Sequence, residues 1–144
     1  MIIILFLRPG CYSEDFIYLD RRQAMIIGIG VDLIEVARVT TACDKEGFVK
    51  RCFTPEEIRL IDQDVLKAAD NFAVKEAVAK VFGTGFRTFF PIDIEVLRNS
   101  EGKPFVNLYG KAEELAKELG ITSIHVSISN TKEYTTAFAV GERT

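Results

Sequence analysis

Residues 71–86, NFAVKEAVAKVFGTGF, decide the fold that this sequence predicts. The stretch has no Gly or Pro before Gly83, and its alanines favour helix, so it predicts a helix that runs into a turn at Gly83 and Gly85. Apolar residues spread almost all the way round this helix, which indicates that it is largely buried. Its only charged residues are Lys75, Glu76 and Lys80.

Glu76 needs a partner, because a buried carboxylate costs free energy unless it is paired, hydrogen-bonded or bound to a metal. Lys80, four residues later, is the ordinary partner, with a contribution of about 0.2–0.5 kcal/mol on an exposed face. A second acid, Asp32, lies in another segment that we expect to be buried. The sequence thus leaves two alternatives open: a helical Glu76–Lys80 pair, or a site that Glu76 shares with Asp32.

The segment that carries Asp32 is residues 25–36, MIIGIGVDLIEV, which is typical of a β-strand. Alternation places three apolar side chains on one face and Gly28, Gly30 and Asp32 on the other. Two glycines on one face of a strand indicate that something approaches the backbone closely. This could be a ligand beside Asp32, or a packed helix with Asp32 capping a turn.

The remaining segments predict a mixed fold. The pattern of residues 37–50 predicts a helix, and Thr54, Pro55 and Glu57 form a capping box that opens a helix through Ile61. Residues 62–70 are a link. Strands at 93–98 and 104–108, a helix at 111–119 and a hairpin at 123–129 and 134–140 follow. This order predicts an α+β domain, with a mainly antiparallel sheet packed against the long buried helix.

Composition narrows the class of protein. With 144 residues the chain fits one domain, and 48% hydrophobic with 27% charged residues is typical of a soluble globular protein. A net charge of -3 and the lack of a basic, aromatic-rich run disfavour nucleic acid as a partner. Three cysteines without a CxxC, and one histidine, suggest neither a disulfide framework nor a zinc site. A reducing cytoplasm fits best.

Residues 1–24 differ from the rest of the chain. They begin MIIILFL, an apolar run that no positive segment precedes and that is too short to span a bilayer. Met25 then starts the strongly patterned strand. We therefore interpret residues 1–24 as an N-terminal extension and residues 25–144 as the functional domain.

Asp32 and Glu76 are candidate metal ligands and catalytic residues. Mg²⁺ takes oxygen ligands and is typically held by one or two carboxylates together with substrate phosphates. If the helix packs across the glycine face of the strand, these two acids supply such a pair, with Lys75 and Lys80 to either side for phosphate oxygens. The turn at Gly83 and Gly85 could present N–H groups to another phosphate. The residues thus suggest a pyrophosphate-bearing substrate held by one divalent ion.

A set of motifs resembles the holo-acyl-carrier-protein synthase family of phosphopantetheinyl transferases. In order they are GIGVDLIEVARV, FTPEE, NFAVKEAVAKVFGTGF, GKPFVNLYGKA and HVSISNTKEYTTAFAV. The resemblance implies Mg²⁺-dependent transfer of 4′-phosphopantetheine from coenzyme A to a serine of apo acyl carrier protein, with release of adenosine 3′,5′-bisphosphate. It also implies a cytoplasmic homotrimer with active sites at subunit interfaces, and a place in lipid metabolism. Fatty acid biosynthesis and secondary metabolism both remain open as the destination of the carrier protein.

The resemblance also implies roles for particular residues. The two metal-binding acids fall on Asp32 and Glu76, and Arg38 falls where the carrier protein is contacted. The coenzyme A contacts fall on Lys75, Lys80, Gly83, Gly85, Ser129, Asn130, Thr131 and Lys132. On sequence alone, residues 129–132 also read as a plain hairpin turn.

Two positions depart from the family pattern, which often has Arg where this chain has Asn71 and His where it has Asn130. These departures keep a second hypothesis open, a non-catalytic module that binds carrier protein or nucleotide. A third hypothesis is a small Mg²⁺ enzyme that hydrolyses nucleotide pyrophosphates. The pair Asp32 and Glu76 disfavours the second, and the absence of further clustered acids for a two-metal site disfavours the third.

Overall fold

A computed structural model describes residues 24–144 of the chain. Its elements are β1 (Met25–Glu35), α1 (Val36–Cys43), α2 (Glu46–Cys52), α3 (Pro55–Gln63), α4 (Leu66–Val81), the 3₁₀ turn η1 (Pro91–Asp93), β2 (Ile94–Arg98), β3 (Pro104–Leu108), α5 (Gly110–Glu118), β4 (Ser123–Asn130) and β5 (Tyr134–Arg143). The predicted α+β class with antiparallel sheets is confirmed. The expected extension, residues 1–24, lies outside the described residues except for Ala24.

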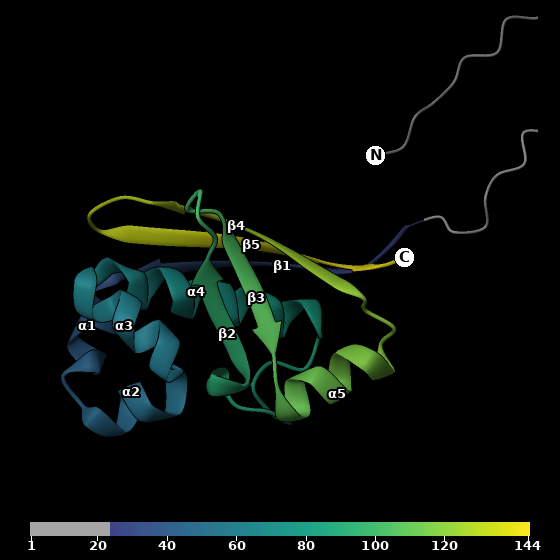
Figure 1. Cartoon of the computed structure of the whole chain (residues 1–144), viewed down its shortest axis with the longest axis horizontal. Coiled ribbons are helices and arrows are strands. Elements are labelled where there is room, and N and C mark those ends of the chain that lie inside the picture. Colours follow the sequence, from purple (N-terminus) through teal and green to yellow (C-terminus); the bar gives the residue numbers. More distant parts are fainter. Residues whose placement is uncertain (1–23) are drawn as a thin grey trace, which may run out of the picture.

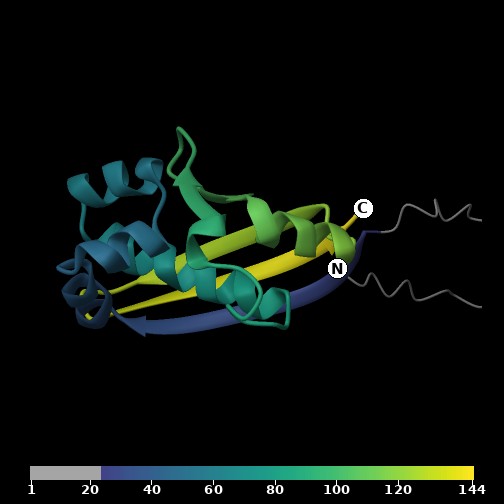
Figure 2. The ribbon, with the colours of Figure 1, turned by 90° about the horizontal axis from the view of Figure 1, so that it is seen from below.

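Two antiparallel sheets flank the long helix α4. One sheet has the strand order β1-β5-β4, and the other is the hairpin β2-β3. The helix contacts all three strands of the first sheet and also β2. Helices α1, α2 and α3 gather at one end of the molecule and α5 lies at the other (Figures 1 and 2). No helix within residues 24–144 is long and apolar enough to cross a membrane.

The helix α4 is buried along most of its length, as its apolar residues predict. It begins at Leu66, five residues before the predicted stretch, so that residues 66–70 are helix and not a link. The side chain of Asp64 accepts a hydrogen bond from the Leu66 N–H at 3.0 Å and satisfies one of the first donors of this helix. This start is not evident from the sequence, because the N-cap residue is Val65, which has no side chain able to cap a helix.

The predicted helix over residues 37–50 is two helices, α1 and α2. Lys45 takes an extended conformation between them and turns the chain back. This turn packs the Phe48 ring against Phe53 and Phe72, with centroids 6.1 and 5.7 Å away. The capping box at Thr54 and Glu57 is present as predicted and opens α3.

The glycine face of β1 lies directly under α4. A Cβ atom on Gly30 would stand 1.9 Å from the Ala77 carbonyl oxygen, and one on Gly28 would stand 2.4 Å from that of Val81. Only glycine fits at such an approach of two backbones. The close neighbour of these glycines is therefore a packed helix and not a ligand. The helix therefore lies against the strand face that also carries Asp32.

We predict that Gly30→Ala destabilises the protein by about 1–3 kcal/mol, the usual cost of overpacking, because either β1 or α4 must move. Gly47→Ala is the matched control, since Gly47 lies in α2 with nothing within 4 Å of an added Cβ. Denaturant midpoints of the two variants measure the difference. Equal midpoints would show that the backbone contact tolerates a methyl group.

Candidate functional site

A pocket of about 430 Å³ opens where β1, α1, α2 and α4 meet. Asp32 and Glu76 both line it, so the structure brings together the two acids that the sequence singled out. Arg38, in the first turn of α1, lines the same pocket. The other lining residues are apolar: Leu33, Ile34, Val39, Ala42, Phe48 and Phe72.

The two acids are positioned by different elements. Asp32 shares a face of β1 with Gly28 and Gly30, and its carbonyl oxygen accepts a hydrogen bond from Thr136 Oγ1 of β5 at 2.8 Å. Glu76 projects from α4 one turn after Phe72. Because α4 rests on the glycines, the two carboxylates share one pocket although 44 positions separate them in the chain.

Lys80 is the salt-bridge partner of Asp32. Its ammonium group donates to Asp32 Oδ1 at 2.9 Å and to the Val31 carbonyl oxygen at 2.7 Å. Of the two alternatives left open for Glu76, the structure has the pocket shared with Asp32, and the salt bridge of Lys80 is with Asp32. Burial raises the pKa of Glu76, the charge of Asp32 raises it further, and Lys80 opposes both effects. Glu76 therefore holds a proton more tightly than an ordinary glutamate.

The acids fit the chemistry of a Mg²⁺ site. Within residues 24–144 no group of three or more His, Cys, Asp or Glu side chains could hold a metal, so Asp32 and Glu76 would be the protein's acidic ligands. Mg²⁺ is commonly held by one or two carboxylates, with water and substrate phosphates in its other positions. An open pocket with two carboxylates leaves room for such ligands.

Lys75 does not lie at this site, which corrects the prediction that it stands beside the metal. Its ammonium group is fully buried on the opposite side of α4, where it donates to Glu57 Oε2 at 2.8 Å. It also donates to the carbonyl oxygens of Pro91, at 3.1 Å, and Ile94. Neighbouring helix positions differ by about 100° in direction, so Lys75 and Glu76 face different layers of the fold.

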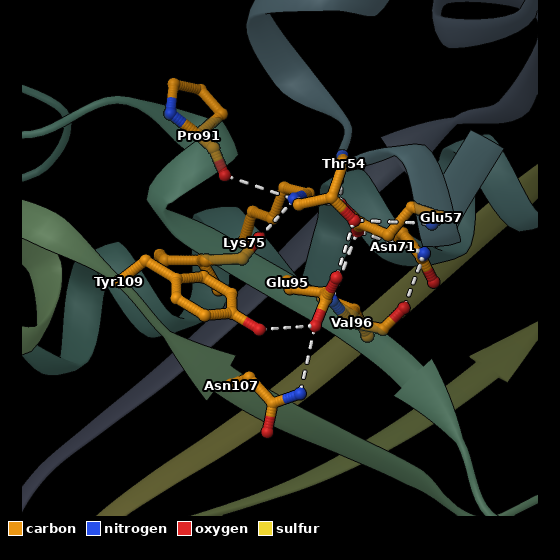
Figure 3. A network of polar contacts seen from close by, with 10 residues as sticks. Thr54, Glu57, Asn71, Lys75, Pro91, Glu95, Val96, Asn107 and Tyr109 are labelled. Atoms are coloured by element: carbon orange, nitrogen blue, oxygen red, sulfur yellow. Dashed lines mark hydrogen bonds and ion pairs between the residues drawn. The ribbon is translucent and has the colours of Figure 1, made fainter.

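Glu57 is the centre of the buried network that holds Lys75 (Figure 3). Besides Lys75, its carboxylate accepts hydrogen bonds from the N–H groups of Thr54 and Val96 and from the Asn71 side chain. Burial raises the pKa of Glu57 and lowers that of Lys75, and each charge opposes the shift of the other. With four donors, one of which is the Lys75 cation, the carboxylate remains satisfied without water.

A second carboxylate extends the network toward β3. Glu95 accepts hydrogen bonds from Thr54 Oγ1, at 2.7 Å, and from Asn107 and Tyr109, each at 2.9 Å (Figure 3). Asn71, one of the departures from the family pattern, also donates to the Val96 carbonyl oxygen at 2.8 Å. These contacts tie α4 to α3 and β2, and so fix the rotation of the helix that carries Glu76.

The other predicted coenzyme A residues lie away from the pocket of Asp32 and Glu76 within one chain. Gly83 and Gly85 have φ angles of +75° and +59° and form the turn after α4. The Gly83 N–H donates to the Lys80 carbonyl oxygen at 3.0 Å, so it caps the helix. Ser129, Asn130, Thr131 and Lys132 lie at the end of the β4–β5 hairpin, and none of them lines the pocket.

Sequence reasoning missed the apolar wall of the pocket and the partner of Lys75. The wall needs the fold of α1 and α2, since Phe48 and Phe72 are distant in sequence and lie side by side only after the chain turns at Lys45. The sequence predicted Glu57 as a capping residue only. One observation could have predicted that it also pairs with Lys75: a lysine on a helix that is expected to be buried needs an anionic partner.

Comparisons with known proteins place these features in a family. Residues 28–139 match the model of the 4′-phosphopantetheinyl transferase superfamily. A holo-[acyl-carrier-protein] synthase of Lachnoclostridium phytofermentans is 57% identical over 118 residues, which cover 82% of this chain and 97% of that relative.

Solved structures agree with this match. A Plasmodium yoelii acyl carrier protein synthase with ADP bound has a TM-score of 0.76 at 33% identity, and covers 85% of this chain and 98% of its own. A Helicobacter pylori holo-[acyl-carrier-protein] synthase in complex with coenzyme A has a TM-score of 0.68 at 28% identity, and covers 78% of this chain and 98% of its own.

We predict that Glu76→Gln stabilises the metal-free protein at neutral pH. The raised pKa means that the folded state binds this proton more tightly than the unfolded chain, so stability falls as the pH rises from the ordinary pKa of glutamate through the raised value. The gain is about 0.5 kcal/mol, because the carboxylate is only half-buried and water screens it. Below the ordinary pKa of glutamate the gain vanishes.

Thermal unfolding in EDTA across this pH range measures the effect. Glu118→Gln, a change at an exposed position of α5, is the control and should leave the pH profile unchanged. A gain that persisted in acid would contradict an electrostatic cause.

Proposed function

Because the chain belongs to the 4′-phosphopantetheinyl transferase superfamily, we propose that it is a holo-[acyl-carrier-protein] synthase. It transfers 4′-phosphopantetheine from coenzyme A to a serine of apo acyl carrier protein and releases adenosine 3′,5′-bisphosphate. The observation that carries this function is the pocket in which Asp32 and Glu76 meet, in a chain that matches holo-[acyl-carrier-protein] synthases over nearly their whole length.

Asp32 and Glu76 hold a Mg²⁺ ion in this proposal. Mg²⁺ held there would supply positive charge to the phosphate oxygens of coenzyme A during the transfer. The protein's own part is mostly positioning, as in other phosphoryl transfers. Lys80 supports this part: it is half-exposed and bound to Asp32, and can turn its ammonium group to a phosphate oxygen when substrate enters.

The remaining coenzyme A contacts are assigned to the two turns. Gly83 and Gly85 present the turn after α4, and residues 129–132 present the end of the β4–β5 hairpin. Lys75 does not belong to this set, because its ammonium group is buried against Glu57. Arg38 is assigned to the acyl carrier protein, since it is exposed at the rim of the pocket and its charge complements an acidic partner.

An exposed apolar face on β1 and β5 supports assembly into a homotrimer. Ile29, Val31 and Leu33 are 61%, 56% and 67% exposed on β1, and Phe138, which pairs with Val31, is 46% exposed on β5. A contiguous apolar face of this kind marks a protein interface. Active sites at the seams would let a neighbouring copy supply the turns that lie away from the pocket in one chain.

Residues 25–144 form the transferase domain in this proposal, which the match over residues 28–139 supports. We place the enzyme in the cytoplasm, where coenzyme A and apo acyl carrier protein are available. Its holo product serves fatty acid biosynthesis.

Incubation with apo acyl carrier protein, coenzyme A and Mg²⁺, followed by intact mass, tests the proposal. The carrier protein should gain the mass of phosphopantetheine. Asp32→Ala should slow transfer about a hundredfold or more, because the charge stabilisation that a metal supplies is worth several kcal/mol. Asp62→Ala, which removes an exposed acid of α3, is the control.

Arg38→Ala should raise chiefly the KM for the carrier protein.

Other outcomes of this assay point to other functions. Coenzyme A binding without any transfer would favour a binding module. Cleavage of coenzyme A without carrier protein would favour a hydrolase.

Sedimentation tests the trimer. Val31→Lys should shift the protein toward monomer, because it places a charge in the middle of the apolar face. Phe90→Lys is the matched control, since Phe90 is 70% exposed but lies next to η1, away from this sheet. A parent protein that sediments as a monomer, or a Val31→Lys variant that stays trimeric, would rule out this face.

A further inference from the structure

Asp70, in the first turns of α4, has a buried carboxylate that neither the pocket nor the Glu57 network uses. Its side chain is 3% exposed. It accepts hydrogen bonds from Asn130 Nδ2, at 2.9 and 3.1 Å to its two oxygens, and from Thr135 Oγ1 at 2.9 Å. Lys67 lies 3.5 Å away and supplies a cation. A buried carboxylate with this many donors holds its partners in fixed positions.

The two hydrogen-bonding partners of Asp70 mark the two ends of the β4–β5 turn. Asn130 is the last residue of β4, Thr135 is the second residue of β5, and the two are paired across the hairpin. One carboxylate from α4 thus clamps both strands where the turn leaves the sheet.

Inside the turn, Thr131 fixes the backbone. Its N–H donates to the Tyr134 carbonyl oxygen at 2.7 Å, and its hydroxyl accepts from the N–H groups of Glu133 and Tyr134 at 3.2 and 3.0 Å. The Glu133 carbonyl oxygen accepts from the N–H of Val36, the first residue of α1, at 2.8 Å. The turn therefore joins the start of α4 to the start of α1, two of the three helices that line the pocket.

The side chain of Asn130 is accordingly held by Asp70, although the residue itself is exposed. Its amide nitrogen donates to both Asp70 oxygens, so Asp70 sets the direction of this amide group, and the amide oxygen, an acceptor, does not bind a phosphate oxygen. The exposed cation of the turn is Lys132. Lys132 is thus the charged group of this turn that can bind a phosphate, and Asn130 anchors the turn that carries it.

We propose that Asp70 is a positioning residue of the coenzyme A site: through Asn130 and Thr135 it fixes the β4–β5 turn and so holds Lys132 for a phosphate of coenzyme A. The inference rests on the proposed function, which assigns this turn to coenzyme A. It changes the role of Asn130 from a phosphate ligand to an anchor.

Two variants test the clamp. Asn130→Ala removes it, and the exchange variant Asp70→Asn with Asn130→Asp rebuilds it with the carboxylate on the hairpin. Asn99→Ala is the matched control: the Asn99 side chain accepts from the N–H groups of Glu101 and Lys103 at 3.0 and 2.9 Å, and so holds the turn of the other hairpin, β2–β3.

Two measurements are made on the full chain, and neither needs turnover. Hydrogen exchange of residues 131–134 reports on the turn, and calorimetry with coenzyme A reports on affinity. Asn130→Ala should speed exchange there and weaken coenzyme A binding about tenfold, the scale of a charge-assisted hydrogen bond. The exchange variant should restore both. Asn99→Ala should speed exchange only near residues 99–103 and leave affinity unchanged.

The outcomes separate this inference from the proposed function. Unchanged exchange at residues 131–134 in Asn130→Ala would overturn the clamp. Faster exchange with unchanged affinity for coenzyme A would overturn the positioning role. If the parent binds coenzyme A but transfers nothing, the proposed function fails, and the same binding measurements still decide the role of Asp70.

Discussion

The contact on which the rest of the structure depends is that between the backbone of α4 and the glycine face of β1. Because Gly28 and Gly30 carry no side chain, the carbonyl ridge of the helix lies against the strand. Asp32 follows on the same strand face and Glu76 lies on the helix, so the approach of two backbones sets where the two carboxylates meet. The relative position of Asp32 and Glu76 is thus set by backbone packing at the glycines, and not by contacts of the charged groups themselves.

The opposite side of α4 is held by polar contacts instead. Glu57, Lys75 and Asn71 form a buried network in which the carboxylate receives donors from α4, from β2 and from the N-cap residue Thr54. Such a network does not guarantee stability, since desolvation offsets much of its attraction. Its effect is directional: a helix that could rotate over a smooth apolar surface is fixed by hydrogen bonds at defined angles. The helix α4 is therefore held by close backbone packing on one side and by buried hydrogen bonds on the other.

Much of this arrangement could be predicted from the sequence. Strand β1, the capping box of α3, the burial of α4 and both hairpins follow from local patterns, and the glycine face correctly predicted a close neighbour. The direction of Lys75 could not be predicted with the same ease. Because the helix is buried on all sides, its sequence pattern does not indicate in which direction Lys75 points. Its partner Glu57 lies on α3 and comes close to Lys75 only in the folded protein. Asp70 likewise gave no signal, because its partners lie 60 and 65 positions later.

The burial of Lys75 has a chemical consequence. Acylating reagents attack the neutral amine of a lysine that solvent can reach, and Lys75 is sealed behind Glu57 while Lys80, five residues later on the same helix, is half-exposed. The two side chains therefore differ in nucleophilic accessibility although they share a motif. The rate at which Lys75 is covalently labelled therefore reports how often the interior of this protein opens to solvent.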